Sequence, residues 1–269
     1  MFDAHVHSAP CVFPRIADDA QTVEWYERAG FDGCLLKGHA EPTVGRAAAA
    51  GKGRSVRVYG GIVLNHAVGG LNLAAVEAAL ALGARAIWMP TLDAHGHLDA
   101  GLPRPPAEPI AIPPVHPPSE AVARRLLGAV AAADVLLATG HLSAPEVAWL
   151  VSAARDAGVR RVVVTHATFT VPGLRPADLT ELCELGAFVE ITAYQLLHQP
   201  GCDAAQLAAA VRAAGPGRFV LSSDAGQPDS PPAPEALQLL VESLAREGLD
   251  PGALEAAASE TPRRLVEPA

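Results

Sequence analysis

The chain has 269 residues, of which 50% are hydrophobic and 18% are charged. This apolar content excludes a disordered polar chain, and the length fits one large α/β barrel or two small domains. Asp and Glu number 29 against 20 for Lys and Arg, which gives a formal charge of −9. An acidic chain without a basic cluster is a poor candidate for binding nucleic acid or an anionic membrane surface.

The N-terminal segment and the cysteines indicate the cellular compartment in which the protein is expected. The chain begins Met-Phe-Asp-Ala-His, without the basic region and apolar core of a secretion signal. No apolar run reaches the roughly 18 residues of a membrane span. The cysteines show no C-x-x-C spacing and are interpreted as reduced thiols: Cys11, Cys34, Cys183 and Cys202. We therefore expect a cytoplasmic protein without a membrane segment.

Short β-rich apolar runs alternate along the chain with Ala-rich amphipathic stretches. Strands are predicted at 2–7, 32–37, 56–64, 84–89, 134–139, 160–165, 187–192 and 218–222. Helices are predicted at 18–29, 41–51, 72–82, 118–132, 144–157, 176–185, 203–214, 234–247 and 250–266. Such alternation implies parallel strands joined by right-handed crossovers, and eight units predict a single (β/α)8 TIM barrel over 1–269. A doubly wound open sheet shows the same alternation, so periodicity alone admits both folds.

One segment, 92–118, interrupts this alternation with a concentration of proline. The prolines are Pro103, Pro105, Pro106, Pro109, Pro113, Pro114, Pro117 and Pro118. They exclude a helix or a central strand. The segment follows the fourth strand, so in a barrel it is either a lid-like substrate loop or a surface excursion. Its histidines (His95, His97 and His116) are expected to face solvent.

Six of the ten histidines lie at the carboxyl ends of predicted strands. They occur in His5-Val-His7, Lys37-Gly-His39, Asn65-His66, Thr139-Gly-His141 and Thr165-His166, and strand eight ends in Ser222-Ser-Asp224. In a parallel barrel these ends converge on one mouth, where barrel enzymes have their active sites. We therefore expect these side chains to form one site.

The His5-Val-His7 motif favours metal binding. Alternation along a strand directs both imidazoles to the same face, where they can share one divalent ion. A third ligand from strand five and a carboxylate from strand eight would complete the coordination. Asp224 would also reduce the positive charge of the site and accept a proton from bound water. Glu190, on strand seven, is interpreted as an ion-pair partner without a catalytic role.

This pattern resembles the amidohydrolase superfamily of metal-dependent hydrolases. The matching residues are His5, His7, His141, His166 and Asp224. The resemblance extends from Asp3 to Glu260-Thr-Pro-Arg-Arg-Leu, which is similar to the closing Asn-Pro-Ala-x-x-Leu helix of that family. It implies a TIM barrel with one or two divalent ions, with zinc favoured and Mn, Fe or Ni as alternatives.

The sequence departs from that family on strand four. Binuclear members bridge their metals with a carboxylated Lys or a Glu there, whereas this strand ends Ile87-Trp-Met-Pro90 and Asp93 lies in the loop. Lys37, on strand two, is a substitute bridge once carboxylated, or alternatively a cation that binds substrate. The other interpretation, which we favour, is a mononuclear site in which His166 is catalytic or supports a ligand.

The resemblance implies hydrolysis of a small molecule at an amide, lactam, lactone or amidine bond. The metal would lower the pKa of bound water to about 7, and Asp224 would carry its proton to the leaving group. The metal, helped by a histidine or Lys37, would stabilise the oxyanion. Candidates for substrate binding are His39, His66 and Arg15, the last of these for a substrate carboxylate.

Three other functions stay open on sequence grounds. A metal-dependent decarboxylase of the same superfamily can use the same ligands. A phosphoesterase of the polymerase-and-histidinol-phosphatase type also opens with His-x-His but normally ends in Asp-x-His, whereas this chain has Asp224-Ala-Gly. A metal-binding barrel without activity is disfavoured because all five ligands are present.

Overall fold

The computed structural model describes residues 1–103 and 107–268, so Pro105 and Pro106 lie outside the described part. In that part eight parallel strands form one sheet in chain order: β1 Phe2–His7, β2 Gly33–Lys37, β3 Arg57–Val63, β4 Ala86–Trp88, β5 Leu136–Ala138, β6 Val162–Val164, β7 Phe188–Thr192 and β8 Phe219–Ser222. A parallel bridge between Val6 and Ala225 joins the first strand to the end of the last. The predicted TIM barrel is confirmed, and each strand end lies within two residues of its predicted position.

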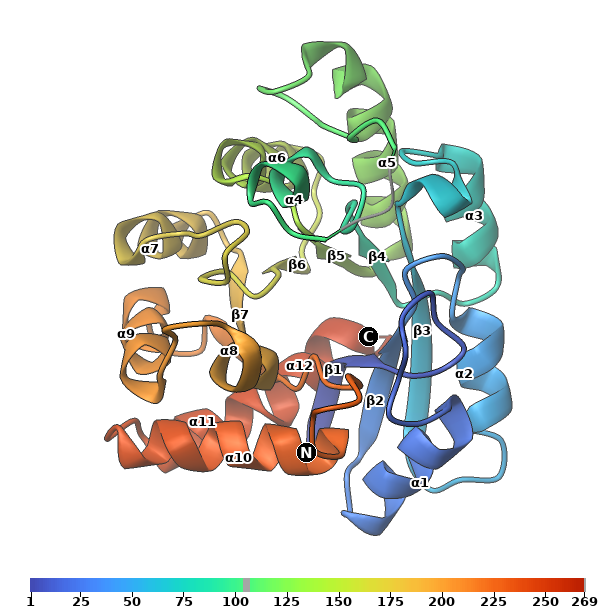
Figure 1. Ribbon diagram of the computed structural model, residues 1–269. Helices are drawn as coiled ribbons and strands as arrows, with labels where there is room; N and C mark the ends of the chain where they lie inside the picture. Colours follow the sequence, from blue (N-terminus) through green and yellow to red (C-terminus); the bar gives the residue numbers. More distant parts are fainter. Residues whose placement is uncertain (104–106, 269) are drawn as a thin grey trace.

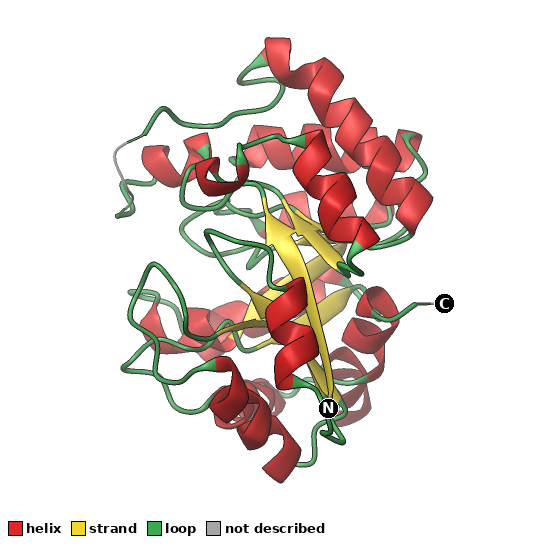
Figure 2. Cartoon of the chain, turned by 90° about the vertical axis from the view of Figure 1, so that its right-hand side faces the viewer, coloured by secondary structure: helices red, strands yellow, loops and turns green. Residues whose placement is uncertain are grey.

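Helices surround the strands (Figures 1 and 2). Their bounds are α1 Asp19–Arg28, α2 Val44–Ala50, α3 Leu73–Ala81, α4 His95–Asp99, α5 Glu120–Ala133, α6 Ala144–Asp156, α7 Pro176–Glu184, α8 Ala193–His198, α9 Ala204–Ala214, α10 Ala233–Arg246, α11 Pro251–Ala257 and α12 Glu260–Val266. The predicted final helix, 250–266, is wrong as one element, because the backbone leaves helical geometry at Ser259 and divides it into α11 and α12. None of these helices combines the length and apolar character needed to cross a membrane.

The apolar core has two layers. The larger layer lies between the strands and the surrounding helices. The smaller one consists of buried side chains from the strands together with two from α12, and includes Phe2, Leu35, Val63, Trp88, Leu136, Phe188, Val220 and Leu265. Stacked apolar side chains of this kind fill the interior of TIM barrels. The barrel is therefore a packed core, on which the strand ends can hold polar groups at fixed positions.

Strand β1 contains an irregularity that decides where its histidines point. Phe2 and Ala4 belong to the smaller, inner layer, whereas Val6 belongs to the outer one. The pairing register of β1 with β2 shifts between Asp3 and Val6. Such a shift reverses the alternation of side chains. Asp3 accordingly contacts Tyr26 of α1, while His5 and His7 reach the polar group at the barrel mouth.

The segment 92–118 contains more structure than its prolines suggest. Residues 95–99 form α4, so the exclusion of helix from the whole segment is wrong. The chain returns through a bridge between Ala94 and Ile110. Gly96 lets α4 approach the backbone of the loop that follows β5. A Cβ at this position would lie 2.7 Å from the carbonyl oxygen of His141. His116 is exposed as expected, but His97 is buried, contrary to expectation.

Candidate metal centre

The carboxyl ends of the strands open into a cavity of about 420 Å³. Its lining includes nearly all the polar residues expected to form the site: His7, Arg15, Lys37, His39, His141, His166 and Asp224. His97 of α4 also lines it. The convergence expected from the strand-end histidines is therefore present in the fold.

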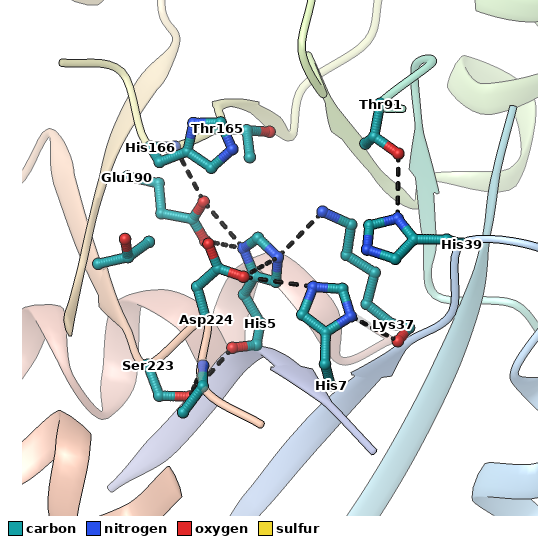
Figure 3. Close-up of polar contacts among 12 residues, drawn as sticks. His5, His7, Lys37, His39, Thr91, Thr165, His166, Glu190, Ser223 and Asp224 are labelled. Atoms are coloured by element: carbon teal, nitrogen blue, oxygen red, sulfur yellow. Dashed lines mark hydrogen bonds and ion pairs between the residues drawn. The ribbon is translucent and has the colours of Figure 1, made fainter. Parts of the chain in front are cut away.

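A compact group forms the floor of this site (Figure 3). His5, His7 and Asp224 each offer one ligand atom, and these atoms lie within 4.8 Å of one another. Oδ1 of Asp224 is 3.1 Å from Nε2 of His5 and 3.3 Å from Nε2 of His7. All three residues are buried, and two imidazoles with one carboxylate suit a divalent transition metal.

The contact between His7 and Asp224 tests whether a cation fits here. Nδ1 of His7 lies 3.1 Å from the carbonyl oxygen of Lys37 and therefore donates to it. Burial, followed by the charge of Arg15, holds the pKa of His7 well below its usual range, so the ring is neutral and Nε2 carries a lone pair. This lone pair faces a carboxylate oxygen, and two acceptors cannot hydrogen-bond to one another. A shared cation satisfies both atoms.

His5 makes a complementary set of contacts. Its Nδ1 lies 3.2 Å from both carboxylate oxygens of Glu190, which confirms the ion-pair role expected for Glu190. Burial lowers the pKa of His5, but Asp224 and Glu190 oppose this effect and raise it to about 9. The ring is therefore protonated at neutral pH, and Nε2–H donates to Asp224. Its proton lies where a metal ion bound by His5, His7 and Asp224 would replace it.

Lys37 lies against the same histidine. Its Nζ is 3.0 Å from Nε2 of His5 and 5.6 Å from the ring centroid of Trp88. Burial lowers the pKa of this amine. Strand β4 presents Trp88 to the site and supplies no ligand. Asp93 accepts a hydrogen bond from the backbone N–H of His66 at 2.8 Å and is not part of the cavity lining.

His166 stands beside the compact group. Its ring centroid is 6.4 Å from that of His5 and 4.9 Å from that of His141. Burial lowers the pKa of His166 to about 4, so the ring is neutral. Its Nδ1 is buried without a hydrogen-bond partner among the described residues, which is costly unless a ligand satisfies it. His166 and Asp224 also have positive φ angles of 27° and 48°, a strained geometry concentrated at functional sites.

His141 contacts His97, a residue that was expected from the sequence to face solvent. Nδ1 of His97 lies 2.7 Å from Nδ1 of His141, and Nε2 of His97 lies 3.0 Å from the carbonyl oxygen of Pro103. A carbonyl only accepts, so Nε2 of His97 carries a proton, and a ring with that single proton accepts at Nδ1 from His141. His141 is then protonated at Nδ1, and its Nε2 lone pair is available to a metal or a substrate.

Residues 1–190 match a family model described as "Family of unknown function (DUF6282)". The chain belongs to this family. The matched residues extend from β1 to Glu190 in β7 and include every expected ligand except Asp224. The sequence matches no curated protein.

Solved structures share the fold of the DUF6282 chain at low sequence identity. The organophosphorus hydrolase from Deinococcus radiodurans is 13% identical with a TM-score of 0.64, over 98% of this chain and 92% of that chain. An amidohydrolase from Pseudomonas aeruginosa is 10% identical with a TM-score of 0.63, over 98% and 94%. The 2,6-dihydroxybenzoate decarboxylase from Rhizobium is 12% identical with a TM-score of 0.59, over 98% and 97%. The resemblance to amidohydrolase-superfamily barrels is thus confirmed at the level of the fold.

Of the three residues expected to bind substrate in the DUF6282 chain, two line the cavity and one lies outside it. His39 is buried, stacks on His7 at a centroid distance of 4.7 Å and contacts the Thr91 hydroxyl through Nδ1 at 3.2 Å. Arg15 is half-buried in the cavity wall. His66 is exposed, outside the cavity lining, with Nε2 at 2.6 Å from a backbone carbonyl oxygen. The structure therefore brings Arg15 and His39 to the site and leaves His66 outside it.

Proposed function

We propose that this protein is a metal-dependent hydrolase that cleaves a carbonyl-centred bond of a small molecule. His5, His7, His141 and Asp224 would hold one divalent ion, and His166, beside His5 and His141, would support it. The observation that carries the proposal is the neutral His7 Nε2 at 3.3 Å from Asp224 Oδ1, because a cation resolves the opposition of two acceptors. Histidine and carboxylate ligands favour zinc, with Mn, Fe or Ni as alternatives.

Asp224 is the proton acceptor in this proposal. Burial raises its pKa, but the charge of His5 and the hydrogen bond that His5 donates outweigh burial and hold the pKa well below its usual range. The carboxylate is therefore ionised at neutral pH. His5 and His7 both contact Oδ1, so Oδ2 can take up a proton from water and return it to a leaving group. A divalent ion bound there would act as a Lewis acid and lower the pKa of water.

Two further groups can stabilise charge that develops on the substrate. Lys37 extends its amine into the site beside His5, and His166 borders the same cavity. Both are buried, so their interactions with a developing oxyanion are stronger than they would be in water. A single ion is favoured because β4 supplies no bridging ligand.

A binuclear site with carboxylated Lys37 is the second candidate. Burial lowers the pKa of this amine, which shifts it toward the neutral form that carboxylation requires. Lys37→Ala would then lose one of two metal equivalents, and bicarbonate with a short carboxylic acid would restore it. Unchanged metal stoichiometry in Lys37→Ala would leave the mononuclear site as the surviving proposal.

Asp224→Asn tests the hydrolase proposal directly. Protein reconstituted with Zn or Mn is assayed against a panel of esters, lactones and amides, with folding checked by circular dichroism. We expect Asp224→Asn to remain folded and to lose about 100-fold or more in kcat/KM. His116→Ala, at an exposed position away from the cavity, should keep wild-type activity. Undiminished hydrolysis by Asp224→Asn would remove the assigned base, and release of CO2 without hydrolysis would instead support a decarboxylase.

A further inference from the structure

Arg15 contributes an unmatched guanidinium group to the cavity. The residue lines the same cavity as His7, Lys37 and Asp224. Its Nε is buried and has no hydrogen-bond partner among the described residues. The guanidinium carbon lies 5.9 Å from the centroid of the Phe13 ring, which orients the group without satisfying its donors. A buried N–H without an acceptor destabilises the protein unless a ligand supplies the acceptor.

The loop that carries Arg15 is tied down at both of its sides. Ala9 N donates to the Ala17 carbonyl at 2.8 Å, which closes the loop on itself. The next residue after Arg15, Ile16, donates its N–H to the Gly226 carbonyl at 2.9 Å. Gly226 follows Asp224 by two residues, so the backbone around Arg15 is attached to the segment that carries the proposed base. This attachment positions the guanidinium relative to the reacting centre.

The acidic groups of the cavity do not neutralise Arg15. Asp224 is engaged through Oδ1 by His5 and His7. The Asp229 side chain is 76% exposed and lies 3.7 Å from Nδ1 of His198. Arg46, also close to the end of β1, provides a contrast, because its guanidinium pairs with two carboxylates.

We propose that Arg15 binds a single carboxylate group of the substrate, whose compact apolar body packs against the rings of Phe13 and Phe169. Both rings line the cavity together with Leu92 and Leu102. The planar guanidinium fits one carboxylate through two parallel hydrogen bonds. One unpaired positive charge matches a carboxylate at −1 better than a phosphomonoester, which carries between −1.5 and −2 at pH 7. The other basic side chain of the cavity, Lys37, lies against His5. That this ligand is also a substrate rests on the proposed hydrolase function.

Binding of benzoate tests this assignment without knowledge of the natural substrate. The dissociation constants of benzoate, benzamide and inorganic phosphate are measured by calorimetry on the metal-loaded and the chelator-treated protein. We expect benzoate to bind at least about 10-fold more tightly than the neutral benzamide or phosphate, because the contact is charge-assisted and bidentate. Arg15→Met should lose about 10-fold or more in benzoate affinity, and Arg15→Lys should retain part of it. Arg125→Met, on the exposed face of α5, makes the same change in net charge and should bind benzoate like the wild type.

The outcomes separate this inference from the proposed hydrolase function. Benzoate affinity that is unchanged in folded Arg15→Met would overturn the inference, even if the protein binds metal and hydrolyses esters. Phosphate that binds more tightly than benzoate would overturn the choice of a monocarboxylate. Benzoate binding that depends on Arg15 in a protein that neither holds metal nor hydrolyses any substrate would support the carboxylate site and contradict the hydrolase.

Discussion

The Nδ1 atoms of His97 and His141 lie 2.7 Å apart, although 44 residues separate the two histidines in the sequence. The contact connects the Pro-rich segment to the end of β5. It depends on Gly96, since any larger residue would collide with the backbone of His141 and Ser143. The segment 92–118 thus places a side chain against one of the expected ligands.

Substitution of His97 should weaken the centre without unfolding the barrel. His97→Phe removes the acceptor for the Nδ1–H of His141, so that ring can rotate or change tautomer. We expect metal affinity, measured by competition with a chromogenic chelator, to fall by about 10- to 100-fold. His97→Asn, which places an oxygen near the position of Nδ1, should recover part of the loss. His116→Phe is the control from the same segment, and equal affinities for His97→Phe and wild type would contradict the positioning role.

The strands and the order of their polar ends were predictable because they depend on local patterns. Each strand is a short buried run bounded by turn signals, and a parallel barrel brings all carboxyl ends to one mouth. This topology gathers His5, His141, His166 and Asp224 without any knowledge of side-chain contacts. The barrel topology alone was therefore enough to predict where the cavity lies.

The remaining features depend on contacts that one-dimensional patterns do not encode. Simple alternation from Phe2 would place His5 and His7 on the outer side with Asp3, and only the register shift of β1 turns them inward. His97 lies within a Pro-rich run, so its burial depends on the packing of α4 against residues 141–143, which follow β5. The His-Gly-His spacing of residues 95–97, soon after strand four, was the available signal.

Glu190→Gln should reduce metal affinity while preserving the fold. Glu190 accepts from Nδ1 of His5 at 3.2 Å and from the backbone N–H of His166 at 3.1 Å. Glutamine keeps the size of the side chain but removes its charge, so the basicity and orientation of His5 decline. We expect affinity to fall by about 10-fold or more in chelator competition. Glu184→Gln, at an exposed site on α7, is the matched control, and identical affinities for both variants would exclude the supporting role of Glu190.

Gly226→Ala should strongly destabilise the folded protein, whereas Gly128→Ala should stabilise it slightly. Gly226 has a φ of 125°, and a Cβ there would lie 2.1 Å from the carbonyl oxygen of His7. Displacement of either segment moves a proposed ligand, so we expect a loss of about 2 kcal/mol or more in the free energy of unfolding, together with weaker metal binding. Gly128 lies within α5 with open space around it, and alanine there should add about 0.5–1 kcal/mol. Urea unfolding of both variants checks the contrast.

Asp3 should make the stability of the protein depend on pH. Burial raises its pKa from 3.8 to about 6, although Tyr26 and the backbone N–H groups of His5 and Ser223 donate to it and lower it. The folded state therefore binds this proton more tightly than the unfolded state, and the stabilisation is complete below about pH 4 and is lost as pH rises through 6. Asp3→Asn lacks this titration. The free energy of unfolding of wild type minus that of the variant should fall by at most roughly 3 kcal/mol between pH 4 and 7, and a constant difference would contradict this pKa.

Elemental analysis of the purified protein tests the central claim most directly. Wild type and a His5→Ala/His7→Ala double variant are reconstituted with Zn or Mn, desalted and compared, with circular dichroism confirming that both are folded. The account predicts close to one equivalent of metal per wild-type chain and nearly none in the variant. Wild-type protein that retains no metal after reconstitution, or a folded variant that retains as much as wild type, would contradict the assignment of His5, His7 and Asp224 as a metal centre.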